Sequence, residues 1–314
     1  MTTFINSVDR ETSPSEALQV EFLATRVSFT WFGVRRALSE EQKATAAEAF
    51  GAESGFLSAA KKLIDTRHPR IKAVNAVKSQ IVRFWKGLSL PFPEPGIRLV
   101  RQEDLDLFEI RMTDFRDELG RAVEALEDQY EQIKLSARSR LGSLYNAADY
   151  PTNLQGLFAV DWSLENVSPP DYLLTLRPDL YERETRRVVA QFDQAVAMAE
   201  EAFCAGFSQL VGHLVDRLGS GEDGQPKQFA DTTVTKLTDF FERFRRLSVR
   251  SNPQLDRLIE QAQAATQGVP PDSLREMSVL RQFVSDKLGD VQSELGKMML
   301  DRPRRNVIRR GKPD

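Results

Sequence analysis

A run of apolar side chains between Gln102 and Leu144 most constrains how this chain can fold. The apolar positions recur in steps of three and four, which places them on one face of a helix. They are Leu105, Phe108, Met112, Phe115, Leu119, Ala122, Leu126, Tyr130, Ile133, Ala137, Leu141 and Leu144. Such a helix would be about 60 Å long at 1.5 Å per residue, too long for an ordinary compact domain to cover. The stripe therefore needs a partner along its length.

A second long helix, from Asp179 to Leu218, is the natural candidate for that partner. Its stripe has the same spacing and a similar length, and the connecting segment lets the chain reverse. We expect an antiparallel, coiled-coil-like helical hairpin. The stripe of this second helix contains Val188, Phe192, Val196, Ala199, Phe203, Phe207, Leu210, Leu214 and Leu218.

Two segments have the pattern of β-strands. Val27, Phe29 and Trp31 alternate with other residues, a period of two in β-branched and aromatic side chains. Residues 157–164 resemble a second strand. Both could belong to a small sheet in a head at 148–178, although the sequence leaves their pairing open.

The predicted fold class is mainly α, with a small β-containing head and a C-terminal helical segment. Prolines and glycines mark the boundaries between the predicted parts. The expected parts are a disordered tail at 1–14, an α/β segment at 15–100, the long hairpin at 101–218 with its head at 148–178, C-terminal helices at 227–300, and a basic disordered tail at 301–314.

Composition argues against several classes of protein. The net charge of −3 does not suit a generally basic, nucleic-acid-coating protein. The single cysteine, Cys204, fits a reducing compartment, and no apolar run approaches the length of a membrane span. The first residues lack the basic and apolar regions of a signal peptide. We expect a cytoplasmic protein with no membrane partner.

The chain offers little that resembles catalytic, cofactor or metal chemistry. Gly219 to Gly224 matches G-x-G-x-x-G, but a predicted helix precedes it, where a dinucleotide site needs a strand. His68, His213 and Cys204 are too few for the usual structural zinc sites. The carboxylates of 103–128 are interleaved with arginines, which is typical of a solvated helix face. We predict no enzyme activity, no cofactor and no metal site.

Two basic surfaces are candidates for nucleic-acid binding. In a predicted helix from 228 to 250, aromatic residues face inward and three arginines share another face. The alternative is an amphipathic helix with a basic exposed stripe. Basic arms also bind phosphate backbones, although the C-terminal arm could equally serve as a solubilising tail. The candidate residues are Arg243, Arg246 and Arg250 on the helix, and Arg302, Arg304, Arg305, Arg309, Arg310 and Lys312 in the tail.

One segment resembles an uncharacterised family encoded by phages and bacteria. The segment runs from Tyr150-Pro151-Thr152-Asn153-Leu154 through Phe158 and Trp162 to Val167-Ser168-Pro169-Pro170-Asp171. Members of that family have long predicted helices flanking a YP-x-x-x-x-L-x-x-x-F type segment and a proline-rich strand. Here the spacing to the first leucine is shorter. The resemblance would cover about residues 20–220, and it implies a helical, non-enzymatic accessory protein of phage or mobile-element origin.

Our leading hypothesis is a structural or interaction protein that works through helical packing and the binding of an unknown protein partner. Self-association through the helical stripes is a further option. The alternative is a nucleic-acid-binding accessory protein that uses the basic C-terminal surfaces. Salt dependence separates the two, because phosphate contacts weaken steeply as salt rises.

Overall fold

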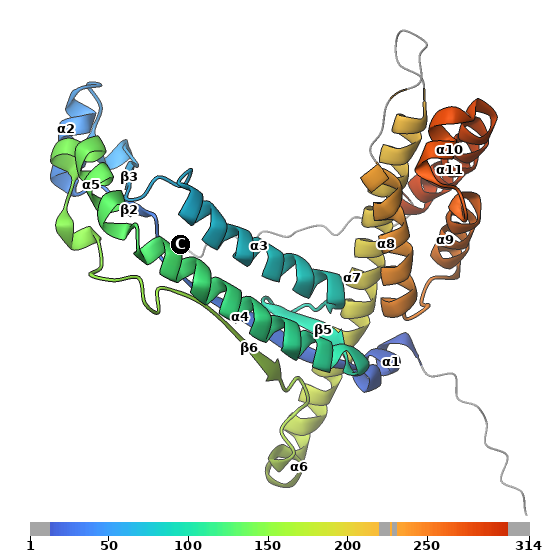
Figure 1. The fold of residues 1–314 in the computed structure, drawn as a ribbon. Coiled ribbons are helices and arrows are strands. Elements are labelled where there is room, and N and C mark those ends of the chain that lie inside the picture. The colour runs from blue at the N-terminus through green and yellow to red at the C-terminus, as the bar shows by residue number, and fades with distance from the viewer. Residues whose placement is uncertain (1–12, 220–226, 228–230, 301–314) are drawn as a thin grey trace, which may run out of the picture. The chain divides into compact units, whose positions relative to one another are not determined.

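The structure, a computed structural model, describes residues 13–219, 227 and 231–300 (Figure 1). Helices make up 68% and strands 12%, which confirms a mainly α chain with a small antiparallel sheet. Three predictions fall wholly or largely outside the described residues. They concern the N-terminal tail, the glycine-rich segment at 219–224 and the arginine-rich tail at 301–314.

The chain divides into two compact units, which we describe separately. The sheet unit consists of Leu23–Ser89 and Gly96–Asn166. The helical unit consists of Met1–Phe22, Leu90–Pro95 and Val167–Asp314. Each unit therefore combines segments that are distant in the sequence.

Three strands of a four-stranded sheet, β5, β1 and β6, lie in the sheet unit, apart from Phe22 at the start of β1. The strand order of the sheet is β4-β5-β1-β6. Strands β1 and β6 pair antiparallel, with Val27 opposite Trp162 and Phe29 opposite Val160, so the two segments with strand patterns are partners. The strand bounds are Phe22–Trp31 for β1, Ser89–Pro91 for β4, Ile97–Arg101 for β5 and Phe158–Glu165 for β6.

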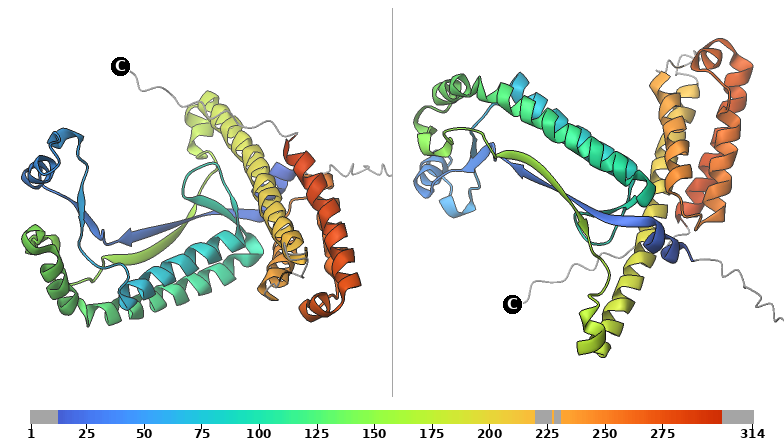
Figure 2. Two further views of the ribbon diagram at one scale, coloured as in Figure 1. Left: turned by 90° about the horizontal axis from the view of Figure 1, so that it is seen from above. Right: turned by 60° about the horizontal axis from the view of Figure 1, so that its bottom comes forward.

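Two helices pack against this sheet. Helices α3 (Pro69–Leu88) and α4 (Leu105–Glu127) run side by side in opposite directions (Figures 1 and 2). The apolar stripes of both helices have helical spacing and contribute to one buried core. Trp85 of α3 is buried and its indole N–H donates to the Thr25 hydroxyl of β1 at 3.0 Å. The buried residues of α4 are Phe108, Met112, Phe115, Leu119 and Leu126.

The first long helix is not continuous, which corrects the prediction of one helix over 102–144. It begins with a 3-10 turn, η2 (Gln102–Asp104), and α4 ends at Glu127. A second helix, α5, spans Tyr130–Leu141. The apolar period survives the break, because Tyr130, Ile133 and Ala137 join the same buried core as Leu126. Gly142, with φ of 52°, ends α5 in a conformation that favours glycine.

A two-stranded ribbon extends from the sheet unit and carries a helical insert. Strand β2 (Arg35–Ala37) pairs antiparallel with β3 (Ala60–Lys62). Between them lie α2 (Glu40–Glu48) and the 3-10 helix η1 (Ser54–Phe56). Ser39 and Gln42 form a capping box at the start of α2, as the residue types at this N-terminus indicate. Two further 3-10 helices of the sheet unit are η3 (Gly142–Leu144) and η4 (Ala147–Asp149).

The helical unit is built on α7, a 41-residue helix from Pro178 to Leu218. Its bounds agree with those expected from the second apolar stripe. Helices α1, α6, α8 and α11 pack on it, and α11 also contacts α9 and α10. The other bounds are Pro14–Glu21 for α1, Tyr172–Leu176 for α6, Asp231–Leu247 for α8, Pro253–Thr266 for α9, Pro271–Glu276 for α10 and Ser278–Leu300 for α11.

The antiparallel hairpin of the two long helices is not confirmed. Helix α4 has its main helical partner in α3, and α7 has its main partner in α11. Both partner pairs lie within single units. An apolar stripe shows that a helix face is buried, but it does not identify the helix that covers it.

An arginine caps the C-terminus of α7 inside the helical unit. Arg281 of α11 is only 8% exposed. Its guanidinium donates to the carbonyl oxygens of Leu218 at 2.7 Å, Arg217 at 3.0 Å and Lys227 at 2.8 Å. The last carbonyls of a helix have no partner within the helix, and a cation also suits the negative end of the helix dipole. Arg281 therefore ties α11 to the end of α7.

We predict that Arg281→Met lowers the free energy of unfolding by about 2–4 kcal/mol, because buried carbonyls lose a charged donor. Arg217→Met is the control, since Arg217 is exposed. Urea denaturation followed by circular dichroism measures both variants. Equal stability of the two variants would contradict this role for Arg281.

Candidate functional site

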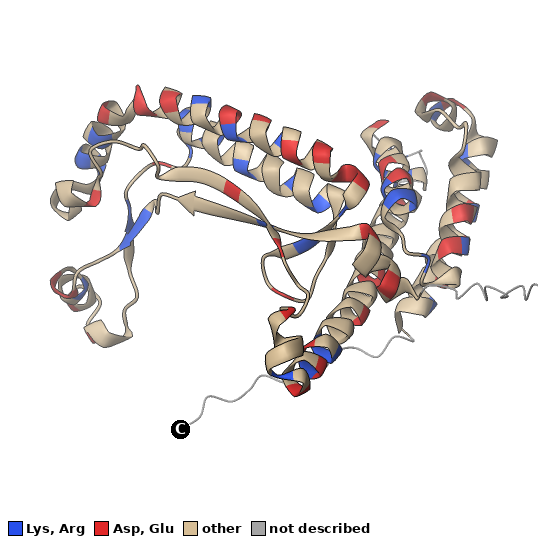
Figure 3. Cartoon of the chain, turned by 90° about the horizontal axis from the view of Figure 1, so that it is seen from below, with Lys and Arg blue, Asp and Glu red and all other residues tan. Residues whose placement is uncertain are grey.

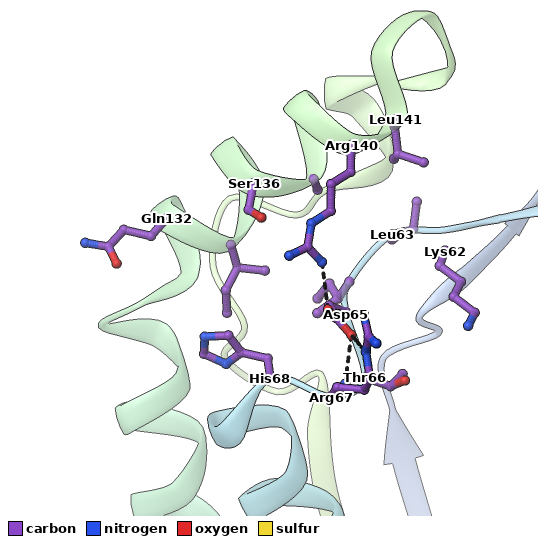
Figure 4. A pocket seen from close by; sticks show the side chains of 13 residues that line it. Lys62, Leu63, Asp65, Thr66, Arg67, His68, Gln132, Ser136, Arg140 and Leu141 are labelled. Carbon is purple, nitrogen blue, oxygen red and sulfur yellow. Dashed lines mark hydrogen bonds and ion pairs between the residues drawn. The ribbon is translucent and has the colours of Figure 1, made fainter.

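A cleft in the sheet unit lies between α5 and the segment that joins β3 to α3 (Figure 4). Its volume is about 1020 Å³. We call it the Asp65 cleft. Its walls are residues 62–68 on one side and, on the other, Gln132, Ile133, Ser136, Ala137, Arg140 and Leu141 of α5.

The cleft depends on the packing of the joining segment. Leu63 and Ile64 are almost fully buried and belong to the core of the sheet unit. The Tyr150 hydroxyl donates to the Leu63 carbonyl at 2.9 Å. Lys61 is 8% exposed, donates to the Leu144 carbonyl at 2.7 Å and pairs with Asp149 at 2.7 Å. These contacts fix the backbone from which the polar side chains of the cleft project.

Asp65 joins two arginines from different elements. Its Oδ1 accepts from the backbone N–H of Arg67 at 2.9 Å and from the Arg67 Nε at 3.2 Å. Its Oδ2 accepts from Nη1 of Arg140 on α5 at 2.6 Å. Figure 4 shows Arg140 reaching across the cleft to Asp65. One carboxylate therefore holds two guanidinium groups close together, against their mutual repulsion.

These hydrogen bonds hold the pKa of Asp65 well below its usual range. The largest cause is the side-chain hydrogen bond from Arg67, followed by the backbone N–H of Arg67 and the side chain of Arg140. Asp65 is therefore ionised at any physiological pH. A carboxylate with so low a pKa is a poor general base.

The other polar groups of the cleft also lack the features of a catalytic centre. The His68 ring accepts the backbone N–H of Arg70 on Nδ1 at 3.3 Å and caps the N-terminus of α3. Burial raises the pKa of Tyr150, behind the cleft wall, to about 12, so its phenol stays protonated at neutral pH. The cleft offers cations, hydroxyls and an apolar floor, which suit binding rather than acid–base chemistry.

Two absences hold for residues 13–219, 227 and 231–300. Within that part of the chain, no group of three His, Cys, Asp or Glu side chains is placed to hold a metal ion. Over the same residues, no helix combines the length and the apolar character needed to cross a bilayer.

The arginines predicted as a nucleic-acid-binding stripe do not share one helical face. Helix α8 ends at Leu247, so Arg250 lies beyond the helix, where it is exposed with φ of 50°. Arg243 is half-buried, and its guanidinium carbon lies 5.4 Å from the ring centre of Phe203 on α7. Burial, and then the nearby charge of Arg246, lowers the pKa of Arg243. Part of this predicted surface therefore packs against an aromatic cluster.

The aromatic cluster between α7 and α8 accounts for the half-burial of Arg243. Phe203 of α7 contacts Phe240 and Phe244 of α8, and Phe207 of α7 contacts Phe240. Phe240 and Phe244 also contact each other, and the ring centres of these four pairs are 5.0–6.3 Å apart. Arg243 stands on the edge of this cluster and Arg246 is half-buried. The predicted tail residues Arg302, Arg304, Arg305, Arg309, Arg310 and Lys312 lie outside the described residues.

Sequence reasoning missed the Asp65 cleft. The available signal was two dibasic pairs, Arg35-Arg36 and Lys61-Lys62, which precede and follow the insert. Nothing in the sequence shows that the two pairs lie opposite each other, because the strands are three residues long and lack a period-two pattern. Asp65 and Arg140 are 75 positions apart, so no local pattern in the sequence shows that they meet.

Comparisons with protein-family models, with curated proteins and with solved structures found no match to this chain. The resemblance centred on residues 150–171 therefore remains a prediction. Inside that segment, Tyr150, Leu154 and Phe158 are buried in the core of the sheet unit.

We predict a specific pH dependence for Asp65→Asn. A carboxylate with a depressed folded-state pKa stabilises the fold above its unfolded pKa, near 3.9, and loses that contribution as pH falls. The variant should therefore unfold at a lower temperature than the natural chain from pH 8 to pH 5. The difference should shrink below about pH 4.

Thermal unfolding across this pH range is the measurement, with Asp161→Asn as the control because Asp161 is exposed on β6. A difference for Asp65→Asn that grows on acidification would show that the Asp65 ion pairs do not stabilise the fold.

Proposed function

We propose that this chain is a non-enzymatic interaction protein that acts by helical packing and by binding a protein partner. The observation that supports this proposal is a pair of exposed phenylalanines on the insert between β2 and β3. Phe50 is 82% exposed and Phe56 is 91% exposed. We call this surface the aromatic tip.

The aromatic tip has the features of a docking anchor. Isolated apolar side chains are common on protein surfaces, but two large aromatic side chains on one short insert expose a substantial apolar area. Aromatic residues also supply much of the binding energy in protein interfaces. Neither side chain contributes to the buried core of the sheet unit.

The charge around the aromatic tip narrows the kind of partner. The insert carries four exposed glutamates and one lysine, Lys43, which pairs with one of them, Glu40, at 2.8 Å. An apolar pocket rimmed by Lys or Arg on the partner would complement this surface. The glutamates are Glu40, Glu41, Glu48 and Glu53.

Two finer expectations from the sequence remain predictions. The pairing of the two long helices as an antiparallel hairpin is not needed for this proposal, since each of them packs within its own unit. A phage or mobile-element origin rests on the resemblance at residues 150–171 alone.

A second candidate function is nucleic-acid binding. The sequence supports it through the basic tail, and the half-burial of Arg243 and Arg246 favours the tail over α8 as the contact. Binding that falls steeply with salt and is weakened by deletion of residues 302–314 would support the tail as the contact surface.

We predict that the double variant Phe50→Ser/Phe56→Ser folds normally but loses its partner. Both side chains are exposed, so the change in the free energy of unfolding should stay within about 0.5 kcal/mol. The double variant Leu135→Ser/Val279→Ser is the matched control, because these side chains are 65% and 80% exposed on other surfaces. Chemical cross-linking in an extract of the source cells, quantified by mass spectrometry, compares the natural chain with both variants.

The expected result is a protein that cross-links to the natural chain and to the control but not to the tip variant. Light scattering tests whether that partner is a second copy of the chain. If the tip variant and the control capture the same proteins and have the same mass in solution, the aromatic tip is not a docking surface.

A further inference from the structure

We propose that the β2–β3 ribbon and the adjoining wall of the Asp65 cleft bind the phosphate backbone of a nucleic acid. The proposal does not involve the aromatic tip or the C-terminal tail. It rests on the placement of cations on the ribbon, where Figure 3 shows Lys and Arg on both strands.

The ribbon places like charges directly opposite each other. Its register sets Arg35 opposite Lys62 and Arg36 opposite Lys61. In an antiparallel pair, such residues have Cβ atoms about 4.5–5.5 Å apart, and like charges at that distance destabilise the pairing. A three-residue ribbon has few hydrogen bonds with which to offset this repulsion.

Among the described residues, only one of the two cross-strand pairs has a carboxylate beside it. Asp149 lies 3.8 Å from the Arg36 Nε and 2.7 Å from the Lys61 Nζ. Arg35 and Lys62 are exposed, and no carboxylate of the described residues pairs with either of them. Because neighbouring residues of a strand point to opposite faces, these two cations share the face that lacks Asp149. That face has an unneutralised charge that an anion would balance.

The unneutralised face adjoins the cleft. Lys62 is itself a cleft-lining residue, together with Arg67 and Arg140. The row Arg35, Lys62, Arg67 and Arg140 is opposed by the single carboxylate of Asp65. Asp65 uses only part of the donor capacity of the two guanidinium groups, since each Arg has five N–H donors. The remaining donors can serve a ligand.

The geometry favours a chain of phosphates over one small anion. The Arg67 and Arg140 side chains are 84% and 61% exposed, and Arg35 and Lys62 are also exposed. The four cations are spread over the ribbon and the cleft wall, so a single phosphate would contact only some of them. A nucleic-acid backbone carries one charge per nucleotide, and neutralising several of them releases several counterions. The row of cations therefore suits a repeating phosphate chain and predicts binding without preference for base sequence.

The test measures binding of the full chain to fluorescent single-stranded and duplex DNA of random sequence, as a function of salt. Four contacts predict a slope of log K against log salt of about −3 to −4. The slope corresponds to a loss of about two orders of magnitude in affinity between 50 and 200 mM salt.

The variant Arg35→Gln/Lys62→Gln should weaken binding at least tenfold at 50 mM salt and reduce the slope by about 1.5–2. The matched control is Arg121→Gln/Lys236→Gln, which removes two exposed cations elsewhere and changes the net charge equally. It should bind within about twofold of the natural chain. The tip variant Phe50→Ser/Phe56→Ser should also bind normally, which keeps this test separate from that of the protein partner.

A second measurement needs no variant and so does not depend on folding of the ribbon mutant. DNA should protect Lys62 of the natural chain from acetylation and leave Lys236 reactive. Three results would overturn the proposal: no DNA binding at 50 mM salt, equal binding by the ribbon and control variants, or competition by polyglutamate as strong as by DNA at equal charge. The last would assign the surface to an acidic protein.

Discussion

The packing of α4 on α3 is the interaction on which the sheet unit depends. Their stripes meet over β1, β5 and β6, and Phe108 and Met112 are fully buried there. Burial of large apolar side chains of this kind contributes about 1.5–3 kcal/mol each. The same core continues past the break at Asp128 and Gln129 into α5, through Tyr130 and Ile133. Because the core fixes where α5 points, it also fixes the distance between Arg140 and Asp65, and so the cleft.

The bounds of the helices were easier to predict from the sequence than the elements against which each helix packs. The bounds of α7 and the start of α3 at Pro69 follow from apolar spacing and a proline at the first turn. The break after α4 contains neither Gly nor Pro, and the apolar period runs through it. Tyr130 and Ile133, which follow the break, pack in the same core as Leu63 and Tyr150. Local patterns carry no information about such tertiary packing.

The Asp65 cleft was harder to predict from the sequence than the helices and their packing partners. The residues of the Asp65 cleft come from two short segments, and each is unremarkable alone: a loop with one aspartate, and the basic last turn of a helix. The cross-strand pairing of Arg35 with Lys62 depends on register, which a ribbon of three-residue strands does not encode in its pattern. By contrast, the arginines of α8 were visible in the sequence. The half-burial of Arg243 was not, because it depends on Phe203 of a different helix.

The ribbon and its insert have opposite charges, and this separation bears on how the two proposed surfaces work together. Arg35, Arg36, Lys61 and Lys62 lie on the strands, whereas four glutamates lie on the insert beyond them. Glu40 is four residues from Arg36, and the other three glutamates lie farther along the insert. The Debye length is about 8 Å at physiological salt, so glutamates more distant than this oppose a phosphate chain on the ribbon only weakly. At low salt the Debye length is longer, and their repulsion should extend farther toward the ribbon. The aromatic tip would then be held away from any nucleic acid and remain accessible to a protein. Under the two proposals, the ribbon offers a basic surface to a phosphate chain and its insert offers an acidic, aromatic surface to a protein.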